Sequence, residues 1–149
     1  MNRHQLWYND YMQLQIGVKV LIQNSEGALL FLKRSQLLST DTENSWDIPG
    51  GRISPDESLK DALVREVFEE IHHTLINEPV LVAAQDIFVD AKDLHVVRLT
   101  YTTAEDIPAI ALSDEHADYS WRRLDGIDDM NIEPYLKAVL QTLGSQKLK

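Results

Sequence analysis

Three glutamates stand close together within residues 65–70, whose sequence is REVFEE. On a helix, at about 100° per residue, Glu66, Glu69 and Glu70 fall within one narrow arc. Like charges at these spacings cost a few tenths of a kcal/mol per pair in an isolated helix unless a cation lies among them. Such carboxylates suit Mg²⁺ or Mn²⁺, which prefer oxygen ligands and leave room for water and substrate phosphates. The alternative is that these glutamates only form a solvated acidic face, which is the commoner role of charged residues on a helix.

The helix that carries these glutamates is predicted to run from about Pro55 to about His73. Its start is indicated by Ser54 as the N-cap, by Pro55 at the first helical position and by Glu57 three residues after the cap. The opposite side of the helix is apolar and predicts a buried face. The residues of that face are Leu63, Val64, Val67, Phe68 and Ile71. The helix therefore packs on one side and presents its carboxylates on the other.

Strands are predicted before this helix. Apolar residues recur at every second position from Leu14 to Ile22, which is typical of a strand with one buried face. A turn at residues 24–27 and the apolar run Ala28–Leu32 complete a predicted hairpin. Trp46–Ile48 is a short strand end, and residues 49–51, Pro-Gly-Gly, are expected to break any regular element.

The elements after the helix complete an α+β fold. Two runs rich in β-branched and apolar residues, Pro79–Val89 and Leu94–Thr103, predict a second hairpin. Tyr119–Arg122 is a further short strand, and a last helix is predicted over Ile132–Leu143, with Gly144 ending it. A mixed sheet flanked by helices accounts for this order of elements.

The composition limits the range of partners. A chain of 149 residues with 44% hydrophobic residues is predicted to form one domain over residues 1–149. Its formal net charge of −10 disfavours nucleic acid and anionic membranes, because both are bound by clustered cations. A small phosphorylated ligand is the expected partner, since a bound divalent metal reverses the sign of an acidic site.

Several kinds of residue and segment are missing from the sequence. The chain has no cysteine, which excludes disulfides, thiolate metal sites and cysteine nucleophiles, so a metal must be held by oxygen or imidazole. Residues 1–13 contain no continuous apolar stretch of signal-peptide length. No segment approaches the roughly 18 uncharged apolar residues of a membrane span. We therefore expect a soluble, cytoplasmic protein.

The spacing around the glutamates matches a known family pattern. From Gly51 the chain reads five residues, Glu57, seven residues and then residues 65–70. This resembles the box of the Nudix hydrolases, G-x5-E-x7-R-E-U-x-E-E-x-G-U with U an aliphatic residue, and every fixed position from Gly51 to Glu70 matches. The resemblance implies an α/β/α sandwich around a mixed sheet. It also implies a metal-dependent pyrophosphohydrolase that cleaves a diphosphate linkage in a nucleoside diphosphate derivative, with Mg²⁺ or alternatively Mn²⁺ as cofactor.

The resemblance assigns roles position by position. The residues that match metal-binding positions are Gly51, through its backbone carbonyl, Glu57, Glu66, Glu69 and Glu70. Arg65 matches a position that orients the glutamates by a salt bridge. The plainer alternatives are helix capping for Glu57 and a surface charge for Arg65.

A general base must accept the proton of the attacking water. The resemblance implies a box glutamate such as Glu69 or Glu70, or a residue of a later loop. Residues 113–118 supply Glu115 and His116 in such a loop, ahead of Tyr119. The alternative is that this loop is only exposed and acidic.

Two box positions depart from the pattern, because His72 replaces the glycine and His73 replaces an aliphatic residue. The glycine suits a helix end in the left-handed conformation, so the helix is expected to run on for a turn or to close differently. Metal binding should survive, since the carboxylates precede the change. Extra ligation by the two histidines is disfavoured against a solvated helix end, where His interacts favourably with the helix dipole.

Other residues offer charge and aromatic surface. Lys33, Arg34 and Arg52 are candidates to bind the substrate phosphates, with plain surface charge as the alternative. The aromatic residues Trp7, Tyr8 and Tyr11 suit stacking on a base, a homodimer interface or, as the commoner role, core packing.

One competing function remains after these assignments. A non-catalytic Nudix-like nucleotide-binding or regulatory domain is the main alternative, although such domains commonly lose the box glutamates that this chain keeps. An isopentenyl diphosphate isomerase is excluded because that class relies on a cysteine. The substrate stays open among a nucleoside triphosphate, a nucleotide sugar and an oxidised nucleotide. In the family pattern, a proline in this region marks ADP-ribose and a tyrosine marks diadenosine polyphosphates as the substrate, and residues 88–90, Phe-Val-Asp, contain neither.

Overall fold

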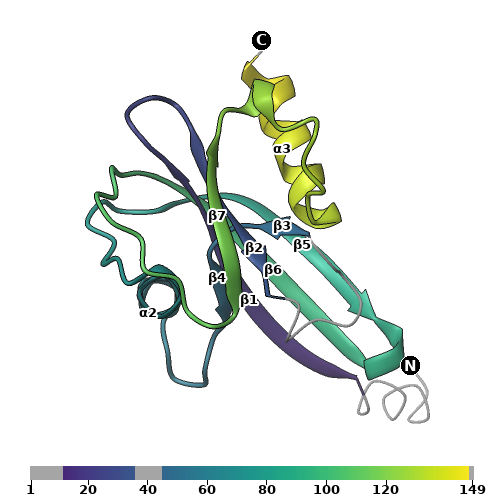
Figure 1. The fold of residues 1–149 in the computed structure, drawn as a ribbon. Helices are drawn as coiled ribbons and strands as arrows, with labels where there is room; N and C mark the ends of the chain where they lie inside the picture. The colour runs from purple at the N-terminus through teal and green to yellow at the C-terminus, as the bar shows by residue number, and fades with distance from the viewer. Residues whose placement is uncertain (1–11, 36–44, 148–149) are drawn as a thin grey trace, which may run out of the picture.

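A mixed β-sheet forms the centre of the molecule (Figure 1). The computed structural model describes residues 12–35 and 45–147. In these residues the strands are β1 (Gln13–Gln23), β2 (Leu29–Arg34), β3 (Trp46–Asp47), β4 (Gly50–Arg52), β5 (Val80–Val89), β6 (Leu94–Ala104) and β7 (His116–Arg122). The helices are α2 (Leu59–Ile71) and α3 (Pro134–Lys147), and short 3-10 turns cover Asp90–Lys92 and Leu124–Gly126.

The strand order is β3-β2-β1-β6-β5, with β4 paired to β1 and β7 paired to β2. The central pair, β1 and β6, is parallel, from Gln13 opposite Leu94 to Gln23 opposite Ala104. The other pairs are antiparallel. The predicted second hairpin is confirmed as β5 and β6. The first predicted hairpin, β1 and β2, pairs only at Gln23 and Leu29, because the rest of β1 pairs with β4 and β6.

The alternation of β1 divides the apolar residues between two cores. Val18, Val20 and Ile22 point to α2, whereas Leu21 points to α3. Figure 1 shows α2 on one side of the sheet and α3 on the other. The expected α+β fold, an α/β/α sandwich around a mixed sheet, is therefore confirmed.

Helix α2 begins later than the sequence predicted. Its N-cap is Ser58, whose hydroxyl accepts a hydrogen bond from the backbone N–H of Asp61 at 3.0 Å. Residues 54–57 form a turn instead, in which Asp56 takes a positive φ of 65°. The Glu57 carboxylate accepts the Ser54 backbone N–H at 3.0 Å. The features taken as a capping box therefore stabilise the turn before the helix.

Helix α2 also ends earlier than predicted. It stops at Ile71, and His72 adopts the left-handed conformation with φ 55° and ψ 37°, the conformation that suits a glycine at this position. The His72 backbone N–H donates to the carbonyl of Phe68 at 2.9 Å. The expectation of a longer or different helix end was wrong. Phe68, predicted to be buried, is half exposed and its ring lies against the His72 ring.

Two glycine-based predictions also fail. Residues 49–51 do not end regular structure, because Gly50–Arg52 form β4 and pair with β1. Gly50 is required there, since its φ is +143° and a Cβ would lie 2.0 Å from the carbonyl oxygen of Val18. Gly144 does not end α3, which continues to Lys147.

None of the helices in residues 12–35 and 45–147 has the length and apolar character that a membrane-spanning helix requires.

Replacing the observed N-cap tests where α2 begins. Ser58→Ala should lower the free energy of unfolding by about 1 kcal/mol, because it leaves the Asp61 N–H without its acceptor. Ser54→Ala is the matched control and should change stability much less, since Ser54 contributes its backbone N–H to the turn. Urea unfolding followed by circular dichroism measures both, and a larger loss for Ser54→Ala would contradict the assignment.

Candidate functional site

A cavity of about 580 Å³ lies among β1, β2, β4, β5, β6 and the second half of α2. The acidic residues that line it include Glu66, Glu70 and Glu115. The basic residues are Lys19, Arg34, Arg52 and Arg98, and His116 also lines the wall. The cavity therefore combines carboxylates with cations at a size that suits a small ligand.

Glu70 is the carboxylate that the fold buries most deeply. Its residue is 4% exposed, and its Oε2 accepts the backbone N–H of Gly50 at 3.0 Å. Burial raises the pKa of Glu70 to about 8, against the opposing effects of Lys19 and of the Gly50 hydrogen bond. The protein thus holds at the cavity wall an acidic group whose charged form needs a cation to be stable.

Glu66 reaches the cavity because Gly51 has no side chain. A Cβ on Gly51 would lie 2.5 Å from the Glu66 carboxylate, so a larger residue would displace it. Partial burial raises the pKa of Glu66, and the hydrogen bond from Arg65 opposes this shift. The same close approach makes Gly51 part of the cavity wall.

Arg65 binds three acidic residues at once. Its guanidinium lies 2.7 Å from Glu57, 2.9 Å from Glu66 and 3.2 Å from Glu69, and it also donates to the carbonyl of Arg52 at 3.1 Å. The hydrogen bond from Arg65 lowers the pKa of Glu57 to about 2, and the same bond raises the pKa of Arg65. Glu57 and Glu69 do not line the cavity, and the Glu69 side chain is 56% exposed.

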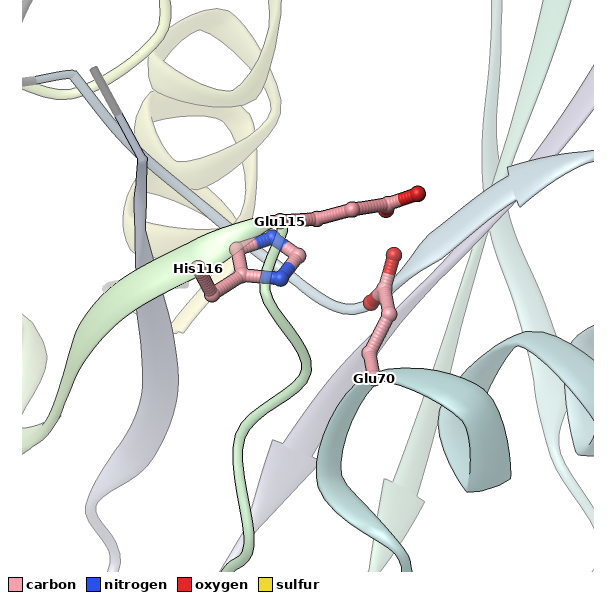
Figure 2. Close-up of side chains that lie close together, drawn as sticks. All are labelled: Glu70, Glu115 and His116. Atoms are coloured by element: carbon pink, nitrogen blue, oxygen red, sulfur yellow. The ribbon is translucent and has the colours of Figure 1, made fainter. Parts of the chain in front are cut away.

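Two more groups lie beside Glu70: Glu115, in the loop before β7, and His116, which was predicted in that loop but is the first residue of β7 because it pairs with Arg34 of β2. One ligand atom each from Glu70, Glu115 and His116 lies within 4.8 Å of the others, and Figure 2 shows the three side chains converging. Burial lowers the pKa of His116 to about 4, and Lys19 and Arg34 act in the same direction. His116 is therefore a neutral imidazole at neutral pH, able to accept a proton or to bind a metal.

The predicted phosphate-binding cations divide into two groups. Arg34 and Arg52 line the cavity, whereas Lys33 does not and lies with its ammonium 5.9 Å from the centre of the Trp46 ring. His72 and His73 also lie away from the cavity lining, bonded to the Ala111 carbonyl at 2.8 Å and to Glu105 at 2.9 Å. Trp7, Tyr8 and Tyr11 lie outside the described residues.

A network of charges that was not predicted from the sequence lies at the cavity wall. Arg98 is 6% exposed and pairs with Asp47 at 2.9 Å and Glu133 at 2.8 Å. Lys19 contacts Asp47 at 3.3 Å and donates to the carbonyl of Ile48 at 3.2 Å. The sequence does contain a signal for this network, because a charged residue interrupts each of two apolar strand patterns, at Lys19 and at Arg98.

One known protein family matches most of the chain. The model of the NUDIX domain matches residues 13–143. The chain belongs to the NUDIX family. The match spans most of the chain, including β1, the glutamates of α2, Glu115, β7 with His116, and most of α3.

Curated relatives of this NUDIX protein resemble it over a limited segment. The m7GpppN-mRNA hydrolase NUDT17 of Bos taurus is 39% identical over 57 residues, which are 38% of this chain and 18% of the relative. The CTP pyrophosphohydrolase of Escherichia coli strain K12 is 38% identical over 56 residues, 38% of this chain and 40% of the relative. The matches therefore span less than half of these relatives.

Solved structures match the fold of this chain over most of its length. The MutT protein from Methanosarcina mazei Go1 superposes with a TM-score of 0.80 at 28% identity, covering 93% of this chain and 98% of its own. The MutT NUDIX hydrolase from Burkholderia pseudomallei has a TM-score of 0.74 at 23% identity, with 87% and 97% covered, and supports the fold alone.

The pH dependence of stability tests the burial of Glu70 in the metal-free protein. The folded protein keeps a proton on Glu70 up to about pH 8, whereas the ordinary pKa is 4.5, so between these values the folded state binds more protons than the unfolded chain. Stability should therefore fall as the pH rises through this window. Relative to Glu70→Gln, the wild type should lose roughly 2 to 4 kcal/mol. Denaturant unfolding in EDTA measures this difference, and parallel pH profiles for the two proteins would contradict the burial.

Proposed function

We propose that this NUDIX protein hydrolyses a diphosphate linkage in a small nucleotide derivative, by attack of water at phosphorus, with the help of a divalent metal. The observation that carries the proposal is the combination of Glu66, Glu70 and Glu115 with Arg34 and Arg52 in one cavity. Carboxylates and cations are needed together, because a diphosphate is bound through metal ions and arginines at the same time.

The donor set fits a divalent cation such as Mg²⁺ or Mn²⁺. The groups at hand are carboxylate oxygens and one imidazole, and the Glu70 carboxyl is buried without a salt bridge among the described residues. Glu66, Glu70 and Glu115 would hold the ion. The family motif also assigns metal contacts to the Gly51 carbonyl, Glu57 and Glu69, and these stay predictions. When bound, the ion neutralises phosphate charge and polarises the phosphorus centre for attack.

Other side chains in and around the cavity bind the phosphates, position Glu66 and accept the proton of the attacking water. Arg34 and Arg52 bind phosphate oxygens through their guanidinium groups and orient the linkage. Arg65 holds Glu66 in position through the contact at 2.9 Å. The proton of the attacking water passes to a carboxylate, either of a box glutamate or of Glu115, or to the His116 imidazole. Gly51 keeps the wall close enough for Glu66 to enter the cavity.

The substrate class follows from size and charge. A cavity of about 580 Å³ suits a ligand of nucleotide size. Related proteins are named for CTP, for m7GpppN-mRNA and for RNA: the CTP pyrophosphohydrolase of Escherichia coli strain K12, the m7GpppN-mRNA hydrolase NUDT17 of Bos taurus and the RNA pyrophosphohydrolase of Pasteurella multocida. We favour a free nucleotide, because a net charge of −10 opposes the binding of a long polyanion.

A nucleotide panel with Mg²⁺ tests the activity. The panel includes nucleoside triphosphates, oxidised nucleotides, nucleotide sugars, and RNA with a triphosphate or a cap. Release of nucleoside monophosphate or phosphate is followed. Glu66→Gln and Glu70→Gln should each lower turnover by at least about a hundredfold, because each removes a proposed metal ligand.

Glu78→Gln provides the control for this experiment. Glu78 is an exposed glutamate that pairs with Lys60 outside the cavity, so its replacement should leave turnover unchanged. Circular dichroism checks that all variants fold. Nucleotide affinity without turnover in the wild type would instead assign the chain to the non-catalytic class of binding domains.

A further inference from the structure

The carboxylates near the cavity fall into two groups by how their charge is balanced. Arg65 pairs with Glu57, Glu66 and Glu69. Among the described residues, no cationic side chain lies within salt-bridge distance of Glu70 or Glu115. An added cation is therefore stabilised most beside Glu70 and Glu115, since the other carboxylates already have a partner.

The imidazole of His116 stands beside these two carboxylates. A ligand atom from each of Glu70, Glu115 and His116 lies within 4.8 Å of the others (Figure 2). Two ligands bound to one ion at about 2.1 Å can be separated by up to about 4.2 Å. Small side-chain rotations therefore suffice to bring all three groups onto one ion.

His116 also lacks the hydrogen bond that fixes other histidine rings. In the part of the chain that the structure describes, His72, His73 and His95 each bond a ring nitrogen to an oxygen, at 2.8, 2.9 and 2.8 Å. The Nδ1 atom of His116 is buried and has no hydrogen-bond partner. A buried nitrogen without a partner costs free energy, and coordination of an ion would satisfy the ring.

The backbone holds this loop in place against β2. The Glu115 carbonyl accepts the backbone N–H of Ser35 at 2.8 Å, and the His116 N–H donates to the carbonyl of Ser113 at 3.2 Å. His116 itself begins β7, opposite Arg34. Both side chains are thus carried by backbone that is hydrogen-bonded before any ion arrives, which lowers the cost of ordering them as ligands.

We propose that His116 is a direct metal ligand that joins the carboxylates Glu66, Glu70 and Glu115 of the proposed site, so that this mixed oxygen and nitrogen site prefers Mn²⁺ or Co²⁺ to Mg²⁺. The inference rests on the proposed function for the presence of a divalent ion, and it adds a nitrogen ligand that changes the metal preference. Imidazole suits these transition metals, whereas Mg²⁺ favours oxygen. With His116 bound to the ion, the proton of the attacking water passes to a carboxylate.

Mn²⁺ bound to the chain of residues 1–149 is the direct probe. Electron spin echo spectroscopy should detect coupling to a histidine nitrogen in the wild type, and ¹⁵N-labelled histidine should change that coupling. Isothermal titration should give a Kd for Mn²⁺ and Co²⁺ that rises at least about tenfold in His116→Gln, with a change for Mg²⁺ of less than about threefold.

His95→Gln is the matched control. His95 is half-buried, stacks on Phe88, bonds to Asp86 and does not line the cavity, so both the coupling and the affinities should match the wild type. The spectrum of the wild type needs no variant, so the test holds even if His116→Gln fails to fold.

The outcomes separate this inference from the proposed function. Hydrolysis with a bound ion but no nitrogen coupling in the wild type overturns the His116 ligand and leaves the hydrolase standing. A nitrogen coupling that disappears in His116→Gln, without hydrolysis of any nucleotide, supports the ligand and overturns the proposed function. Equal Kd values for Mn²⁺ in the wild type and in folded His116→Gln also overturn the inference.

Discussion

The burial of the Glu70 carboxyl is the constraint on which the rest of the site depends. A carboxylate removed from water is stabilised only by hydrogen bonds or by opposite charge, and Glu70 has the single backbone N–H of Gly50 and distant help from Lys19. The rise in its pKa measures how incomplete that compensation is. An acidic group held in this way has a high affinity for a cation, and the protein keeps it at the wall of a cavity that admits ligands.

The local backbone around α2 serves this arrangement. Gly50 adopts a φ of +143° and passes close to β1, which brings its N–H to Glu70. Gly51 leaves space for Glu66, and Arg65 fixes Glu66 from the other side at 2.9 Å. These elements are short and adjacent in the chain, but they act together only because β4 pairs with β1 and lies under α2.

Periodicity and spacing predicted the parts of the fold that depend on local preference. The alternation in β1, the hairpin of β5 and β6 and the two helices follow from apolar patterns of about 2 and 3.6 residues. The ends of α2 were misplaced because Ser54 and Ser58 both carry a capping hydroxyl, and the contact between Glu57 and Arg65 favours the turn over an earlier start. His72 could replace a glycine because a left-handed residue at a helix end costs little when its side chain gains a hydrogen bond.

The candidate site was predictable where it is contiguous and unpredictable where it is assembled. Glu66 and Glu70 follow from the box, whereas the pairing of Arg98 with Asp47 and Glu133 joins residues that lie 51 and 35 positions apart in the sequence. The chain alone could not show that the Glu69 side chain is exposed, because that depends on which part of the α2 surface β4 and β1 cover.

The most direct measurement is the anomalous scattering of Mn²⁺ in crystals grown without metal and then soaked in the ion. If Glu70 binds the ion, a peak will lie about 2.2 Å from a Glu70 carboxylate oxygen, inside the cavity. Crystals with no peak there, or with a peak only on the exposed side of α2 near Glu69, would contradict binding at Glu70.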